Sequence, residues 1–317
     1  MTMTLLDQDA PRSAMAPAQW LRETTAAVRV SFTWFGVRKT LTHEQKNQAA
    51  ESFGAEGEYL SARKKLLDTK HAAYKEVTGV RGKVSAYWKS LTLPFPEPGI
   101  RLIRQQEIER FNQQMAGYRV ELEAAVRRLD NHYAELKAAA RRRLGDLYNP
   151  TDYPPSLQGL FGVDWDFPNI EPPDYLCQLN PVIYEQERAR VAARFEEAVQ
   201  LTEQAFISEF AKLIEHLTER LRDNGEGKRK IFRDSAITNL TEFFNRFRQL
   251  NVRSNQELDA LVEQAQWVVQ GHQPQDLRDS DGLRQHVAAQ LSRVQAALDG
   301  MLVDRPRRRI IRNPEAS

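Results

Sequence analysis

The chain has 317 residues, of which 41% are hydrophobic and 28% are charged, so it can form one large or two modest domains with a real core. Its 45 basic and 43 acidic residues leave a net charge of +2, which argues against a general nucleic-acid binder but not against a local basic patch. The single cysteine, Cys177, excludes an internal disulfide framework and a cysteine-rich zinc site.

The first 26 residues are expected to form a mobile N-terminal arm. They carry acidic residues where a secretory signal peptide has basic ones, and they lack a long apolar stretch. No apolar run of about 18 residues occurs further along, so neither a transmembrane helix nor a membrane partner is expected. A lone thiol fits a reducing compartment, which predicts a cytoplasmic protein in which Cys177 is buried and structural.

Residues 27–39, with the sequence AVRVSFTWFGVRK, carry the clearest strand pattern in the chain. Apolar side chains alternate with polar ones, and this period of two is typical of a half-buried β-strand. The apolar positions are Val28, Val30, Phe32 and Trp34, which we therefore expect on one buried face.

A single strand leaves its backbone donors and acceptors unpaired, so this strand needs a partner. Three partners are open: part of the segment 160–180, the tail at 304–317, or another chain. The segment 160–180 is favoured for residues 28–35 because its aromatic residues indicate that it is ordered. Pairing with another chain would instead make the protein a homo-oligomer or a polymerising subunit.

Residues 27–103 are expected to combine this strand with a helical body. Thr42 and Gln45 have the spacing of a capping box, which predicts a helix over 43–53. A second helical stretch is expected from about 58 to 91, and the prolines of LTLPFPEPG then end it.

Residues 104–222 are expected to form a long antiparallel helical hairpin that resembles a coiled coil. Two proline-free stretches, at about 103–144 and 182–222, have apolar residues spaced three and four apart, including Leu122 and Phe206. Such long helices need a partner along their apolar stripe. The alternative is that both belong to a globular bundle.

The segment 145–181 joins these two helices and is rich in both proline and aromatic residues. Disordered linkers contain few aromatic residues, so this one is expected to be ordered and functional, with short strands at LFGVDWDF and YLCQL. Asp164 and Asp166 could form an acidic site there. The candidate partner-binding residues are Trp34, Tyr153, Phe161, Trp165 and Phe167.

The last third of the chain is expected to be a C-terminal helical body at 223–303 followed by a basic tail at 304–317. The fold class is therefore mainly α, with a long helical hairpin, a helical body and a small β element near the N-terminus.

Motifs that would indicate an enzyme are missing from the sequence. It has no phosphate-binding loop, no dinucleotide fingerprint, no HExxH sequence and no nucleophile elbow. The six histidines are scattered over different expected helices without the spacing of metal ligands. We therefore expect no catalytic residue, no metal and no cofactor.

Three basic clusters could contact phosphate groups, which would give salt-sensitive binding that does not depend on sequence. In an antiparallel hairpin the first two would lie at opposite ends of the rod, which weakens this interpretation. They are Arg141, Arg142 and Arg143; Lys228, Arg229 and Lys230; and Arg307, Arg308 and Arg309.

The order of several short motifs resembles a family of phage and mobile-element proteins that is classed as a domain of unknown function. The motifs are WFGVRKTLT, SARKKLLD, PFPEPG, YPPSLQGLFGVDWDF, LVEQAQWVVQG and a terminal arginine run, and they span about residues 27–312. Genes of that family are often found near MoxR-type AAA+ ATPases and cobaltochelatase-like partners with von Willebrand-A-type domains. The resemblance implies such an ATPase as a protein partner and supplies no catalytic residue.

Three functions remain open at this point. The first is a non-catalytic adaptor or structural subunit that acts with an ATPase or another protein. The second is a nucleic-acid-binding protein that uses the basic clusters. The third is an enzyme with a site in the segment 145–181.

Overall fold

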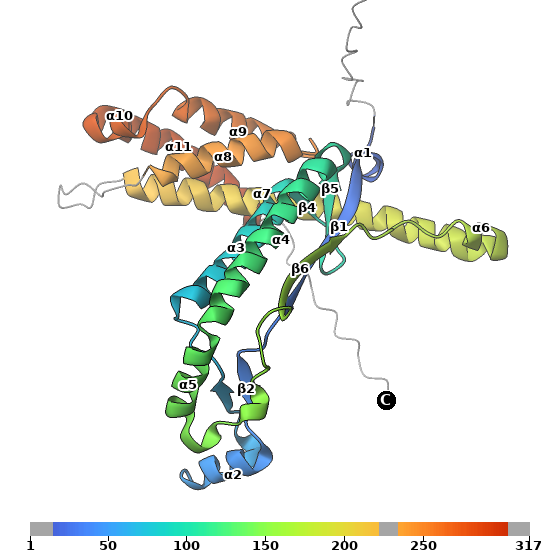
Figure 1. The fold of residues 1–317 in the computed structure, drawn as a ribbon. Helices are drawn as coiled ribbons and strands as arrows, with labels where there is room; N and C mark the ends of the chain where they lie inside the picture. Colours follow the sequence, from blue (N-terminus) through green and yellow to red (C-terminus); the bar gives the residue numbers. More distant parts are fainter. Residues whose placement is uncertain (1–14, 222–233, 304–317) are drawn as a thin grey trace, which may run out of the picture. The chain divides into compact units, whose positions relative to one another are not determined.

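The computed structural model describes residues 15–221 and 234–303, and Figure 1 shows its ribbon. These residues are mainly α-helical and include a small antiparallel sheet with the N-terminal strand, which confirms the expected fold class at this level. None of the helices in this part of the chain combines the length and the apolar composition that a membrane span needs.

The chain divides into two compact units, each built from segments that are distant in sequence. Among the described residues, unit 1 contains 15–26, 92–102, 169–221 and 234–303, and unit 2 contains 27–91 and 103–168. This division differs from the expected series of an arm, a hairpin and two helical bodies, because neither unit is one continuous stretch of chain.

Unit 1 is organised around one long helix, α7 (Pro181–Leu221), which packs against α1, α8 and α11 (Figure 1). Phe206 of α7 lies 5.0 Å from Phe247 of α8, measured between ring centroids, and Phe210 stacks on Phe243 at the same distance. The other helices are α1 (Pro17–Thr24), α6 (Tyr175–Leu179), α8 (Ser235–Leu250), α9 (Gln256–Val269), α10 (Pro274–Asp279) and α11 (Asp281–Val303).

Residues 17–24 form helix α1, where the sequence predicted a mobile arm. Pro17 stands at the first helical position, where its missing N–H costs nothing, and Leu21 is fully buried. The arm prediction for residues 1–14 lies outside the described residues, as does the basic tail from residue 304 onward.

Unit 2 contains two neighbouring helices, α3 (Ala72–Leu91) and α4 (Ile108–Asn131), followed by α5 (Tyr133–Leu144). A two-stranded sheet and the short helix α2 lie at the end of the unit where α5 is found (Figure 1). These elements are β2 (Arg38–Thr40), α2 (His43–Glu51) with the expected capping box, and β3 (Arg63–Lys65); 3₁₀ turns lie at Gly57–Tyr59, Gly145–Leu147 and Pro150–Asp152.

The main sheet has four strands in the order β4-β5-β1-β6. The boundary between the two units falls within β1 and within β5. The strands are β1 (Thr25–Trp34), β4 (Thr92–Pro94), β5 (Ile100–Arg104) and β6 (Phe161–Asp166), and a 3₁₀ turn at Gln105–Glu107 precedes α4.

The pairing of β1 with β6 confirms the predicted partner of the N-terminal strand. The two strands are antiparallel, and the register places Val30 opposite Trp165 and Trp34 opposite Phe161. The alternation is also as predicted: Val28 and Val30 are buried, whereas Phe32 and Trp34 on the same side are half-buried.

The predicted long hairpin of residues 104–144 and 182–222 is not confirmed. Its first arm belongs to unit 2, where α4 packs against α3, and its second arm belongs to unit 1, where α7 packs against α11. Leu122 and Phe206 are both buried, as a seam requires, within their separate units. The apolar spacing therefore identified the buried face of each helix correctly but did not identify what covers it.

Three local predictions are wrong. The helix expected from residue 58 begins only at Ala72, because β3 and a turn occupy the residues before it. The segment YLCQL forms the helix α6 instead of a strand. Cys177 in that helix is exposed, since α6 is only 5 residues long and buries none of its side chains.

The segment 145–181, which was predicted to be ordered, lies wholly within the described residues, and Asp130 of α4 anchors its first part. The carboxylate of Asp130 accepts hydrogen bonds from the Leu157 N–H at 2.7 Å and the Ser156 hydroxyl at 2.9 Å. Burial would raise the pKa of Asp130, but these bonds and one from Gln158 lower that pKa below its ordinary value.

Candidate functional site

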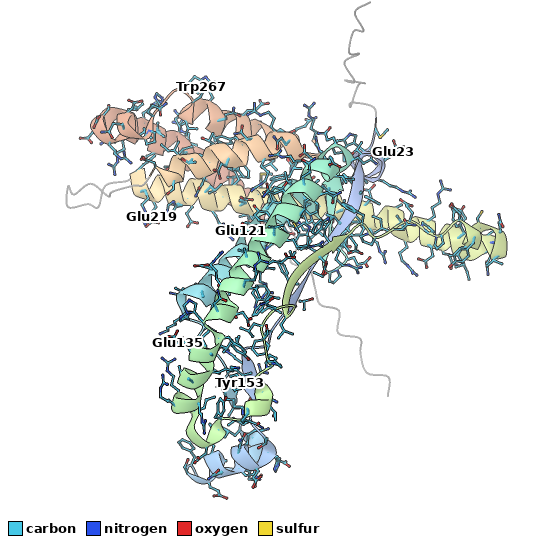
Figure 2. The ribbon with its side chains drawn as sticks, in the orientation of Figure 1. Glu23, Glu121, Glu135, Tyr153, Glu219 and Trp267 are labelled. Carbon is cyan, nitrogen blue, oxygen red and sulfur yellow. The ribbon has the colours of Figure 1, made fainter. Side chains whose placement is uncertain are left out.

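The aromatic residues predicted to bind a partner mostly pack inside unit 2. Phe161 is buried, and its ring lies edge-on to Trp34 at 4.9 Å. Tyr153, labelled in Figure 2, is also buried and donates its hydroxyl hydrogen to the carbonyl of Leu66 at 3.1 Å. Tyr153 and Phe161 are therefore core residues, which corrects the prediction that they bind a partner.

Trp165 and Phe167 differ in how much of their side-chain surface remains exposed to a partner. The indole N–H of Trp165 donates to Asn112 Oδ1 at 2.7 Å, and the Arg119 guanidinium stacks on its ring at 4.6 Å. Phe167 keeps 38% of its surface exposed while its ring meets Phe111 at 6.4 Å. Of the five candidates, Phe167 is the one with the exposure that partner binding requires.

The two aspartates considered for an acidic site are each paired with an arginine. Asp164 lies 2.8 Å from the Arg119 guanidinium, and Asp166 lies 2.6 Å from that of Arg29. The pair with Arg29 lowers the pKa of Asp166. Both carboxylates are exposed, so surface ion pairs account for them and nothing here favours a catalytic role.

Of the three basic clusters, only Arg141, Arg142 and Arg143 fall within the described residues. They form the last turn of α5, where cations offset the partial negative charge of the helix C-terminus. Arg143 is also paired with Asp68 at 2.8 Å, whereas Arg141 and Arg142 are exposed. The clusters at 228–230 and 307–309 lie outside the described residues.

A concentration of positive charge that the sequence analysis overlooked lies in the two-stranded sheet of β2 and β3. We call these six residues the basic ribbon, since all but Thr40 are lysine or arginine. Three antiparallel pairs make it up: Arg38 faces Lys65, Lys39 faces Lys64, and Thr40 faces Arg63.

One face of the basic ribbon is held by a buried carboxylate. Asp152, whose side chain is 1% exposed, lies 2.5 Å from the Lys39 ammonium and 2.7 Å from that of Lys64. Burial would raise the pKa of Asp152, but hydrogen bonds from these lysines lower that pKa below its ordinary value. Lys64 is 6% exposed and also donates to the carbonyl of Leu147. This face is therefore structural.

The other face of the basic ribbon has no such partner among the residues that the structure describes. Successive strand residues point to opposite sides, so Arg38, Arg63 and Lys65 lie away from Asp152, and all three are exposed. Within residues 15–221 and 234–303, none of the three forms an ion pair. Arg38 and Lys65 are directly opposite each other, an arrangement that is destabilising for like charges.

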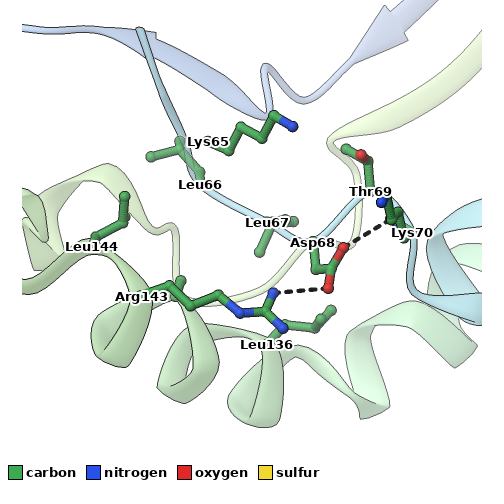
Figure 3. Close-up of a pocket in the computed structure, with 10 residues that line it drawn as sticks. Lys65, Leu66, Leu67, Asp68, Thr69, Lys70, Leu136, Arg143 and Leu144 are labelled. Carbon is green, nitrogen blue, oxygen red and sulfur yellow. Dashed lines mark hydrogen bonds and ion pairs between the residues drawn. The ribbon is translucent and has the colours of Figure 1, made fainter.

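A cavity of about 460 Å³ connects the ribbon to the end of α5 (Figure 3). Lys65 and Lys70 line it together with Arg143, and the side chains of Leu66, Leu67 and Leu136 are its apolar part. Figure 3 shows Asp68 between the Arg143 guanidinium and the Lys70 N–H, and both contacts lower the pKa of Asp68. The cavity thus places Lys65 of the ribbon and Arg143 of α5 in one region of unit 2.

A further group of ligand-type side chains lies in the same unit. One potential ligand atom from each of His71, His132 and Glu135 lies within 4.8 Å of the other two. Among the described residues this is the group of histidine and carboxylate side chains that could hold a metal ion. The sequence predicted no metal site, because its histidines are scattered over different expected helices without the spacing of metal ligands.

Comparisons with known proteins leave the function to be argued from these residues. No protein-family model matches the chain, and no curated protein or solved structure is significantly similar to it.

Signals for the basic ribbon are present in the sequence. VRK and SARKKLLD each contain adjacent basic residues, but nothing in either stretch indicates that they pair. Strands of three residues are too short for an alternation pattern to be read, so the ribbon follows only from the observed register.

Proposed function

We propose that this protein is a non-catalytic binding protein whose basic ribbon contacts the phosphate backbone of a nucleic acid without reading its sequence. The observation that carries the proposal is the exposed pair Arg38 and Lys65, two cations that lie directly opposite each other and have no anionic partner in the described part of the chain. A phosphate group bound between Arg38 and Lys65 would be attracted to both cations and would offset the repulsion between them.

Two further features support this assignment. Arg63 adds a third exposed cation to the same face, and Arg141 and Arg142 add two more at the nearby end of α5. Asp152 fixes the opposite face through Lys39 and Lys64, so the ribbon is pre-organised before a ligand arrives. A net charge of +2 leaves room for such a local patch.

The test is a salt titration of binding to random-sequence duplex and single-stranded DNA, followed by fluorescence anisotropy. We compare the native chain with the triple variant Arg38→Ala, Arg63→Ala, Lys65→Ala. The variant should bind more weakly at low salt, and its log–log salt slope should be smaller by about 2–3, since each lost phosphate contact removes about 0.9 for duplex DNA.

The matched control removes the same charge from exposed positions on α3 and α4: Lys75→Ala, Lys89→Ala, Arg127→Ala. This control should keep the affinity and slope of the native chain to within about one contact. Equal losses in the two triple variants, or no binding by the native chain at low salt, would contradict the proposal.

A second candidate function is that of an adaptor or structural subunit, favoured by exposed apolar residues in unit 1. Tyr175 and Leu179 of α6 are exposed, as are Val182 and Ile183 at the start of α7, with Leu179 at 77%. Closely spaced exposed apolar side chains mark interaction surfaces. The resemblance to the phage and mobile-element family implies a cytoplasmic MoxR-type AAA+ ATPase as the partner, and a second copy of the chain is the other occupant.

This second candidate is tested by light scattering after size exclusion, with and without a MoxR-type ATPase. The variant Leu179→Asp, Val182→Asp should lose any complex, while Val120→Asp on α4, which replaces another exposed valine, should keep it. A homo-oligomer that the double variant disperses identifies a second copy as the occupant. If the native chain is monomeric and does not bind the ATPase, the adaptor function is contradicted.

A further inference from the structure

His71, His132 and Glu135 come from three positions that the fold of unit 2 brings together. His71 directly precedes α3, and its carbonyl accepts the first helical hydrogen bond, from Lys75. His132 is the residue between α4 and α5, and Glu135 lies in the first turn of α5. The cluster therefore joins the start of one helix to the junction of two others.

Packing between α3 and α4 accounts for this meeting. The start of α3 lies beside the end of α4: the rings of His71 and His132 are 5.1 Å apart, and Arg128 is paired with Glu76 at 2.7 Å. On α5, Glu135 is three residues after His132, so both occupy one face of a helical turn. The Glu135 carboxylate lies 3.5 Å from His132 Nδ1.

We propose that these three side chains bind one divalent transition-metal ion of the Zn²⁺ or Co²⁺ class. Two imidazoles and one carboxylate suit such ions, whereas Mg²⁺ and Ca²⁺ prefer sites made entirely of oxygen ligands. The ligand atoms, all within 4.8 Å of one another, are close enough to converge on one ion by small side-chain rotations. His132 and Glu135 are exposed, so a water molecule completes the fourth position.

Metal binding requires small rearrangements at His71. The Nδ1 atom of this ring accepts a long hydrogen bond, 3.3 Å, from the Ala73 N–H. A metal-bound neutral imidazole uses one nitrogen for the ion and carries its proton on the other, so ligation gives up this contact. His132 and Glu135 share a contact of 3.5 Å, and because both side chains are exposed they can turn together towards an ion.

The consequence of a bound ion would be mechanical. His132 has φ −93° and ψ 1°, and its side chain does not cap α5, so backbone hydrogen bonds and packing hold the α4–α5 junction. An ion at this cluster would tie the junction to the start of α3. Helix α5 carries Arg141, Arg142 and Arg143 at its other end, so its position would be fixed more firmly.

The experiment uses the full chain without a histidine tag, stripped of metal with EDTA and titrated with ZnCl₂ by calorimetry. Co²⁺ serves as a spectroscopic probe, because a four-coordinate site gives visible absorption bands that are much stronger than those of octahedral aqueous Co²⁺. We expect one ion per chain and no competition by excess Mg²⁺.

Variants decide whether these residues are the ligands. His71→Ala, His132→Ala and the conservative Glu135→Gln should each weaken Zn²⁺ binding at least about 10-fold and alter the Co²⁺ spectrum. The matched control, His216→Ala, removes an exposed histidine of α7 and should change neither. Circular dichroism confirms that each variant is folded. An absence of Zn²⁺ binding by the native chain, or equal weakening in His216→Ala, would overturn the proposal.

Discussion

Two antiparallel strand pairs of unit 2 use side-chain charge in opposite ways. In the β1–β6 pair, Arg29 faces Asp166 and their charges attract, while Trp34 faces Phe161 with their rings in edge contact. In the basic ribbon, Arg38 faces Lys65 and their charges repel. The first pair is stabilised by its own cross-strand contacts, whereas the second depends on Asp152 behind it.

This difference separates a strand pair that is stabilised by its own side chains from one in which exposed charges oppose the pairing. In a strand pair whose charges and rings contact each other, few side-chain groups remain to bind a ligand. The basic ribbon has Asp152 as an anchor on one face, whereas Arg38 and Lys65 on the other face repel each other and form no ion pair among the described residues. Controls aside, each substitution below alters either the β1–β6 pair or the basic ribbon with its anchor.

The largest effect is expected from Phe161→Ala in β6. Phe161 is buried and contacts both Trp34 and Phe35, so truncation removes apolar contacts and leaves a cavity. The free energy of unfolding should fall by about 3–5 kcal/mol, as measured by urea denaturation. Thr33→Ala, at an exposed position of β1, should change it by less than about 0.5 kcal/mol. Equal effects of the two would mean that β6 does not pack as described.

A smaller loss is expected from Asp152→Asn, which removes the anchor of the basic ribbon. Lys64 would remain buried without its counter-charge, and breaking such a pair costs about 3 kcal/mol. The value is at the low end because Lys39 is more than half exposed and Lys64 keeps its bond to Leu147. Asp146→Asn, at an exposed carboxylate close in the chain, serves as the control and should be nearly neutral.

The same variant gives a pH dependence with a definite sign. The pKa of Asp152 is lowered in the folded state from its ordinary value of 3.8, so its contribution is complete above that value and is lost as the pH falls through the folded pKa. Urea midpoints measured from pH 6 down to pH 3 should therefore decline more for the native chain than for Asp152→Asn. Parallel curves would show that the carboxylate is not paired.

The smallest effects are expected when an arginine is replaced by glutamate, which should raise the free energy of unfolding in one strand pair and lower it in the other. Arg38→Glu replaces repulsion of Lys65 by attraction and should raise the free energy of unfolding by about 0.2–1 kcal/mol. Arg29→Glu places two carboxylates opposite each other and should lower it by a similar amount. Arg38→Glu should at the same time weaken binding to DNA, so stability and binding would change in opposite directions. A loss of stability in both variants would remove the contrast between the two strand pairs.

The sequence predicted the elements with strong periodicity and missed those defined by tertiary contacts. The β1–β6 pairing was predictable because alternation in β1 and aromatic residues in β6 both indicate a half-buried strand. The apolar faces of α4 and α7 were predictable for the same reason. Their partners were not, since a stripe of apolar side chains fits any complementary helix, and α3 and α11 supplied the cover.

The candidate sites depended even more on long-range contacts. The basic ribbon requires a register between two three-residue strands, and basic residues are poor indicators of strand structure. The cluster of His71, His132 and Glu135 depends on the packing of α3 beside α4. Neither distance along the chain nor residue spacing could have shown that these side chains meet.

The arrangement of α1 has a consequence for the order in which the chain folds during synthesis. Leu21 is fully buried, and α1 packs against α7, which begins at Pro181. An isolated helix of 8 residues is unstable in water, so α1 gains its structure only after α7 has been made. At about 5–20 residues per second this takes roughly 10–40 s. The last segment of unit 2 ends at residue 168, so all of that unit is synthesised before the helix that covers α1 begins at Pro181.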